Sequence, residues 1–238
     1  PVGGWPRAIL FRVFALIIAG GAVYNNQDGL GAIIVLFVLV VPFERLFPRH
    51  DHQNFRRPNL NLDLGYALAS PFLQAIGLVA AVFVGVLSFT WIPGLILKPY
   101  VQSIPDPYLL LVGVAMFDLA SYWTHRWYHE VPQLWKFHAI HHSPEHMDWA
   151  SGFRAHPFDG TLIAPAFFFL IAAGFSPEFS GLVAVVQIVL GLFLHANVRI
   201  WLKPISKIIM TPEFHHWHHA NEPEAIWCNY STFLPLWD

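Results

Sequence analysis

The histidines of this chain stand in spaced groups, and the spacing restricts the folds that the chain can adopt. Neutral imidazole is the commonest nitrogen ligand of transition metals. Residues three or four positions apart share one face of a helix, so each group aims its rings to one side. The groups are His125 and His129; His138, His141 and His142; and His215, His218 and His219. Because eight rings are more than one metal ion can use, we expect a fold that brings three helix faces together around two metal ions.

Two isolated histidines are candidates to join these groups. His195 ends an apolar run and points back toward the groups, so we expect it to be a ligand. His156 precedes a proline at a predicted helix boundary and is a further candidate ligand. We interpret the single cysteine, Cys228, as a small packing residue, because thiolates suit closed zinc sites and no second cysteine is present. We interpret His50, His52 and His146 as surface groups, and His216 as a supporting or surface group.

The chain is strongly apolar. Of its 238 residues, 55% are hydrophobic and only 12% are charged, whereas an average soluble domain has roughly 25% charged residues. Apolar runs approach the ~20 residues that cross a bilayer. They occupy 8–24, 30–47, 64–90 and 107–124, and a last pair at 161–174 and 178–195 forms either two spans or a re-entrant hairpin. We expect an all-α integral membrane protein with about four transmembrane helices plus a short hairpin.

The loops between these runs predict the orientation in the membrane. Loop 44–62 carries four arginines, whereas 25–29 has no basic residue and 91–106 has only Lys98. The positive-inside rule then places the N-terminus, loop 44–62 and every histidine group on the cytoplasmic face. We therefore expect transmembrane helices in 1–104 and a catalytic region in 105–238, with a cytosolic helical cap that holds a dinuclear metal site. No run rich in Lys and Arg is present, so a nucleic-acid partner is disfavoured.

Local motifs around the groups predict how they are presented. Asp118 lies two helical turns before His125, where its carboxylate is a candidate to accept the free N–H of a ligand ring. Pro132 interrupts the helix after His129, so the next helix should turn back. The sequence Thr211-Pro212-Glu213 is typical of a helix start, so the third group should open a helix.

Six segments together resemble the fatty acid hydroxylase/sterol desaturase superfamily of membrane di-iron oxygenases. They are Y-W-T-H-R-W-Y-H, W-K-F-H-A-I-H-H-S, R-A-H-P, L-H-A-N-V-R, T-P-E-F-H-H-W-H-H and N-Y-S-T-F-L-P-L-W-D, within residues 105–238. The resemblance implies a four-helix membrane base under a cytosolic cap, two Fe ions, and O2-dependent oxidation of a lipid C–H bond. Zinc can replace iron in a recombinant protein.

The resemblance also implies which residues form the site. The supporting residues would be Asp118, Asn197 and Asn229. The metal ligands would be His125, His129, His138, His141, His142, His195, His215, His218 and His219, with His156 as a tenth. The chain departs from the family at Trp227 and Ser231, where an acidic residue and a glycine are usual, and at Gly191, where some members have a histidine. One ligand is therefore either missing or supplied by His156 or a water molecule.

The function implied is hydroxylation of a membrane lipid such as a fatty acyl chain or a sterol. A lipid desaturase or sterol methyl oxidase would use the same site, and a zinc-dependent membrane hydrolase is the alternative from another class. A bis-histidine haem protein and a non-catalytic metal-storing protein are weaker alternatives. Electrons would come from an external donor, a reductase with cytochrome b5, ferredoxin or a similar carrier, because the chain has no flavin, haem or iron–sulfur motif.

Overall fold

The computed structural model describes residues 27–200, 204–225 and 227–238, so the apolar run expected at 8–24 lies outside it. The described residues are helical and contain no β-strand, only an isolated bridge between Pro48 and Val198. The all-helical class is thus confirmed. The α-helices are α2 (Gln27–Leu46), α3 (Leu60–Leu87), α4 (Trp91–Val101), α5 (Asp106–Glu130), α6 (Pro132–His141), α7 (Ala164–Ala172), α8 (Pro177–His195) and α9 (Pro212–His218). The 3-10 helices are η1 (Ser151–Phe153), η2 (Pro157–Ile163), η3 (Ile205–Lys207) and η4 (Pro235–Trp237).

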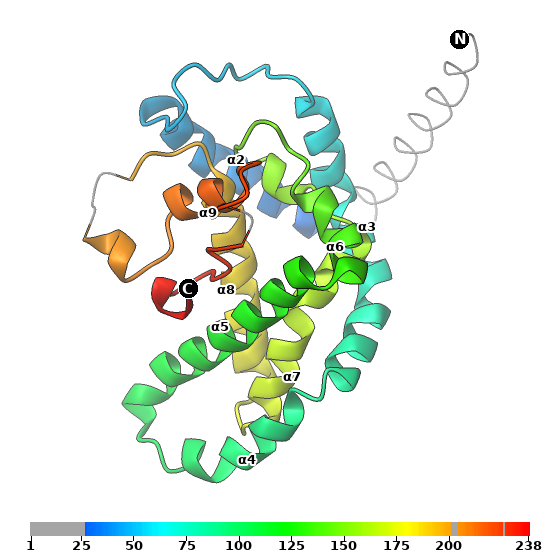
Figure 1. The fold of residues 1–238 in the computed structure, drawn as a ribbon, viewed down its shortest axis with the longest axis vertical. Coiled ribbons are helices and arrows are strands. Elements are labelled where there is room, and N and C mark those ends of the chain that lie inside the picture. Colours follow the sequence, from blue (N-terminus) through cyan, green and yellow to red (C-terminus); the bar gives the residue numbers. More distant parts are fainter. Residues whose placement is uncertain (1–26, 201–203, 226) are drawn as a thin grey trace.

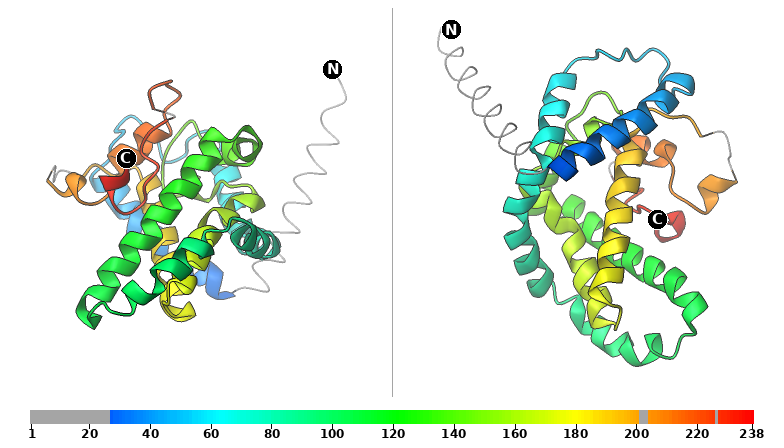
Figure 2. Two further views of the ribbon diagram at one scale, coloured as in Figure 1. Left: turned by 60° about the horizontal axis from the view of Figure 1, so that its bottom comes forward. Right: turned by 180° about the vertical axis from the view of Figure 1, so that it is seen from behind.

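Helix α7 is the centre of the apolar core. It packs against α3, α4, α5 and α8, and Figure 1 shows it between α5 and α3, with further views in Figure 2. The small side chain of Ala166 lets these neighbours approach α7. Ala166 and Leu170 are both completely buried. Phe117 of α5 and Val183 of α8 belong to the same buried cluster. Burial of such side chains stabilises the fold by roughly 1.5–3 kcal/mol each.

The membrane-spanning character differs among the helices. Among the described residues, only α8 is by itself long and apolar enough to cross a bilayer. The segments Gly77–Leu87 and Trp91–Val101 reach that length only as a pair, and they are bent by 72°. Val79 on α3 and Leu182 on α8 expose 78% and 60% of their surface, as expected for lipid-facing side chains. The structure thus fits membrane association, whereas the four-span count stays a prediction.

The segment 91–106, which we expected to be a loop, contains a helix. Helix α3 ends at Leu87 because Phe89 has a positive φ of 55°, which turns the chain. The apolar sequence that follows forms α4, which packs on α7. Gly94 allows this contact, because a Cβ there would lie 2.5 Å from the carbonyl oxygen of Phe169. Tertiary packing therefore decides the structure of this segment.

The histidine-bearing helix ends meet at one end of the molecule. The last turns of helix α5 carry His125 and His129. Pro132 begins α6 after a one-residue break at Val131, as predicted. The last turn of α8 and the whole of α9 join them at the end opposite α4 (Figure 1). Helix α9 begins at Pro212, as the sequence predicts, although Thr211 makes no side-chain cap.

Candidate metal centre

Nine of the ten predicted ligands gather into two groups in space, and these two groups differ from the three groups along the sequence. In each group, the ring nitrogens that could bind an ion all lie within 4.8 Å of one another. The first group is His125, His129, His138, His142 and His218, and the second is His141, His195, His215 and His219. The two groups touch, since the rings of His142 and His219 stack with centroids 4.1 Å apart.

Each histidine triplet divides between the two groups. On α6, His138 and His142 belong to the first group while His141 belongs to the second. On α9 the assignment is reversed, since His215 and His219 belong to the second group and His218 to the first. The i,i+4 pair serves one group and the i+3 ring serves the other. One helix can serve both groups in this way, because a 3.6-residue period separates i+3 from i+4 by about 100°.

Backbone carbonyls fix the tautomer of four of the nine grouped rings. A carbonyl oxygen only accepts, so each Nδ1 donates its hydrogen and the lone pair remains on Nε2. The bonds run from His125 to Tyr230 O at 2.7 Å, His141 to Arg154 O at 3.1 Å, His195 to Gly191 O at 2.7 Å and His218 to Cys228 O at 2.6 Å. Fixing Nδ1 in this way leaves Nε2 available to a metal.

The geometry of the Nε2 atoms fits a bound cation. His141 and His195 both donate through Nδ1, yet their Nε2 atoms lie 3.2 Å apart with lone pairs facing. The buried Nε2 atoms of His142 and His218 have no hydrogen-bond partner. Burial lowers the pKa of His141 to about 4 and that of His218 well below its usual value, so these rings are neutral. A positive ion between the nitrogens removes both the repulsion and the unpaired atoms.

Asp159 is a supporting residue that sequence reasoning missed. Its Oδ1 lies 3.3 Å from Nδ1 of His138, and its other oxygen accepts the N–H of His156. Burial raises the pKa of Asp159 to about 7, although the backbone hydrogen bond opposes the shift. The signal was present in the sequence, because H-P-F-D is a reciprocal helix cap that places an acid three residues after the capping residue.

Replacing Asp159 by asparagine should weaken metal binding in the first group. The change removes the acceptor charge beside His138, and we expect metal affinity to fall about 10- to 100-fold. Competition with a chelator measures this affinity. The exposed Asp51→Asn change is the control and should leave it unaltered. Equal affinities for D159N and the unchanged chain would mean that Asp159 serves only the cap of η2.

His156 lies outside both groups. Its Nδ1 accepts the N–H of Phe158 at 3.1 Å, and its ring packs on Phe137. His156 therefore joins neither group, because its ring caps η2 instead. The space beside Gly191 is open, and its carbonyl accepts the Nδ1–H of His195.

His216 and His50 form a hydrogen-bonded pair behind the second group. The Nε2 of His216 donates to the carbonyl oxygen of His195 at 3.1 Å, so its Nδ1 accepts from Nε2 of His50 at 3.1 Å. Burial lowers the pKa of His216 to about 3, so this ring is neutral. His216 supports the site, as expected. The interpretation of His50 as a surface group is wrong, because loop 47–59 folds back over α9; His52 is exposed as expected.

Asp118 acts on backbone rather than on a ligand ring. Its carboxylate accepts N–H groups of the C-terminal segment, from Thr232, Phe233, Leu234 and the indole of Trp237. The predicted contact with His125 is therefore wrong, because the ring binds the Tyr230 carbonyl of that same segment. Asp118 supports His125 only indirectly, because it holds the C-terminal segment whose Tyr230 carbonyl accepts the hydrogen bond of the ring.

The two asparagines also bind backbone. Asn197 accepts the N–H groups of Arg49 and His50 through Oδ1, which ties the end of α8 to loop 47–59. Asn229 donates to the carbonyl of Phe214 at 3.0 Å and has a positive φ of 61°. Cys228 lies in neither group, and its carbonyl oxygen holds His218. These residues place segments of chain beside the rings.

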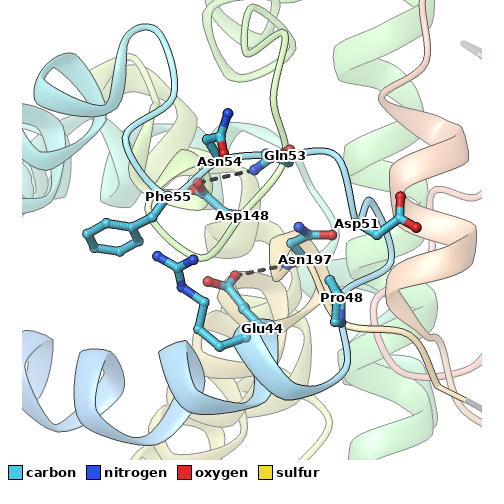
Figure 3. A pocket seen from close by; sticks show the side chains of 9 residues that line it. Glu44, Pro48, Asp51, Gln53, Asn54, Phe55, Asp148 and Asn197 are labelled. Carbon is cyan, nitrogen blue, oxygen red and sulfur yellow. Dashed lines mark hydrogen bonds between the residues drawn. The ribbon is translucent and has the colours of Figure 1, made fainter.

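A small polar pocket of about 120 Å³ is lined by Asn197 and by residues of the segment 44–55 (Figure 3). Glu44 at the end of α2 lines it and accepts the N–H groups of Trp149 and Asn197 at 2.8 and 2.9 Å. Gln53 and Asp148 point into the same space (Figure 3). No histidine lines this pocket, so it is separate from both histidine groups.

Comparison with known proteins agrees with this geometry. The model of the fatty acid hydroxylase family matches residues 110–238, more than half of the chain. The chain belongs to the fatty acid hydroxylase family. All nine grouped histidines lie within the matched region. No solved structure matches the chain significantly.

Curated relatives in this family are similar over part of their length. An ornithine lipid hydroxylase of Rhizobium tropici, OlsE, is 28% identical over 217 residues, covering 87% of this chain and 62% of the relative. The alkylglycerol monooxygenase of Danio rerio is 28% identical over 134 residues, covering 55% of this chain and 28% of the relative. The human alkylglycerol monooxygenase is 28% identical over 131 residues, with the same coverage. The chain thus spans less than two thirds of these relatives.

Proposed function

We propose that this chain is an O2-dependent hydroxylase that oxidises a C–H bond of a membrane lipid at two iron ions. The observation that carries the proposal is the pair of touching histidine groups, whose fixed tautomers direct unpaired Nε2 atoms inward. Membership of the fatty acid hydroxylase family supports it. The relatives, a hydroxylase of ornithine lipid and a monooxygenase of alkylglycerol, support a lipid substrate.

Each of the two histidine groups would hold one ion. The first group would hold one ion through five rings and the second would hold the other through four. Iron supplies the activation of O2 and the removal of hydrogen from an unactivated carbon. The protein holds the ring protons at Nδ1 through backbone carbonyls, and it buries His138, His215 and His218 away from water. The donors in both groups would be neutral imidazoles, which suit iron.

The exposed apolar surfaces support placement in a membrane. We propose a multi-pass protein in which α8 and the bent pair of α3 and α4 contact lipid and the histidine end faces the cytoplasm. An external reductase with cytochrome b5, ferredoxin or a similar carrier would deliver electrons there. A lipid substrate would then reach the centre from the membrane side and O2 by diffusion.

Lipid mass spectrometry of host membranes with and without the protein tests the proposal. Hydroxylation predicts a lipid that gains one oxygen atom and is absent with the His138→Ala variant. A lipid that loses two hydrogens would replace hydroxylation by desaturation on the same site. An unchanged lipid profile from a metal-loaded, reduced protein would overturn the proposal.

Metal removal separates the iron oxygenase from the zinc hydrolase. We expect a chelator to abolish lipid oxidation, and we expect ferrous iron, but not zinc, to restore it, because zinc has no redox chemistry. Product formation before and after reconstitution is the measurement. A cleaved lipid that forms with zinc and without O2 would favour the hydrolase.

A further inference from the structure

We propose that Asp63 is a positioning residue for the second histidine group. Its buried carboxylate holds Arg154, whose backbone carbonyl accepts the Nδ1–H of His141, and this contact sets how firmly the second group retains its metal. The inference rests on the proposed metal centre. It concerns residues far from the histidine motifs in sequence, since Asp63 begins α3.

Asp63 joins two arginines in the interior. Oδ1 lies 2.6 Å from both Nε and Nη2 of Arg154, and Oδ2 lies 2.7 Å from Nη2 of Arg57. The side chain of Asp63 is completely buried, while those of Arg57 and Arg154 are 2% and 6% exposed. Two-point contacts of this kind fix an arginine in orientation as well as in distance.

A second carboxylate, that of Asp148, also belongs to this network and lies in the same chain segment as Arg154. Arg57 binds Asp148 through Nε at 2.5 Å and Nη2 at 2.6 Å. Asp148 also accepts the N–H groups of Ala150 and Ser151, both at 3.1 Å. The segment 148–154 is therefore held at both ends by one set of two acids and two arginines with no net charge.

This segment touches two rings of the second group. The Arg154 carbonyl accepts the Nδ1–H of His141 at 3.1 Å. Gly152 packs directly against His195, because a Cβ at this position would lie 3.1 Å from the ring. His141 and His195 in turn bring their Nε2 atoms to 3.2 Å. Fixing one short segment thus fixes the pair of rings that share a metal.

The first group depends on other segments. His125 and His218 donate to carbonyls of Tyr230 and Cys228 in the C-terminal segment, and His138 binds Asp159. None of these contacts passes through Asp63. Loss of the Asp63 carboxylate should therefore loosen the second group and leave the first group unchanged.

Release of iron from the anaerobically loaded protein to ferrozine tests the inference. The unchanged chain should hold two iron ions and release them in two phases. We expect Asp63→Asn to accelerate one phase about 10- to 100-fold, as outer contacts of metal ligands do, and to leave the other phase alone. In a His215→Ala background, where the second group lacks a ligand, D63N should have no further effect on the remaining iron.

The outcomes separate the two proposals. Failure of the unchanged chain to bind iron would overturn the proposed function. Acceleration of both phases, or an effect of D63N that persists with His215→Ala, would show a merely structural role and overturn the inference, as would two unchanged phases. If D63N does not fold, Arg154→Lys keeps the charge, loses the two-point contact, and carries the same expectations.

Discussion

Replacing His138 or His218 by alanine is expected to abolish lipid oxidation. Both rings belong to the first group and both are almost completely buried. Each alanine removes one imidazole nitrogen and leaves a cavity that water can enter beside the remaining rings. We expect product to fall by more than the ~100-fold that outer-contact changes cost metal sites. Quantifying oxidised lipid in host membranes, at matched protein levels, measures the loss.

The matched control for these variants is His52→Ala. His52 is an exposed histidine that belongs to neither group, so its removal should leave product unchanged. Iron content of the purified variants shows whether lost activity follows lost metal. Product formation that survives either His138→Ala or His218→Ala would contradict the assignment of the first group.

Replacing Asp118 by asparagine is expected to destabilise the protein by about 3 kcal/mol, because buried hydrogen bonds to a carboxylate are lost and donors are left unpaired. The carboxylate accepts four N–H groups, two at each oxygen. An amide keeps the shape but faces the N–H donors of Leu234 and Trp237 with a donor of its own. Thermal unfolding in detergent and proteolysis of the C-terminal segment are the measurements.

The control for Asp118 lies at the start of the same helix. Asp106 is exposed in the first turn of α5, so Asp106→Asn should cost only the ~0.3–1 kcal/mol of a helix-dipole interaction. Because the Tyr230 carbonyl belongs to the segment that Asp118 holds, D118N should also weaken iron binding by the first group. Equal unfolding temperatures for D118N and D106N would show that the four contacts are dispensable.

The sequence predicted those features that depend on local spacing. The helix that runs into His125 and His129, the break at Pro132 and the start of α9 at Pro212 follow from apolar periodicity and proline placement. Convergence of the eight histidines on three helix faces was also predicted, with His195 as a separate candidate, and the structure brings all nine rings together. The division of each triplet between two groups did not follow, because it depends on how α6 and α9 are rotated about their axes.

Other parts of the site have no local signature. The acceptors for four of the grouped rings are backbone carbonyls, which every residue possesses. Only the fold therefore selects Tyr230, Arg154, Gly191 and Cys228. The network around Asp63 joins positions about 90 residues apart in sequence. His50 was misjudged for the same reason, because its partner His216 lies 166 residues away.

The source of the oxygen atom in the product tests the central claim most directly. Membranes that contain the protein and its electron donor would be supplied with ¹⁸O2 in ordinary water, and the lipid product would be weighed by mass spectrometry. Two irons held by these histidines in a lipid hydroxylase predict a product that carries ¹⁸O and is absent without O2. A product that carries oxygen from water, or that forms without O2, would contradict the account.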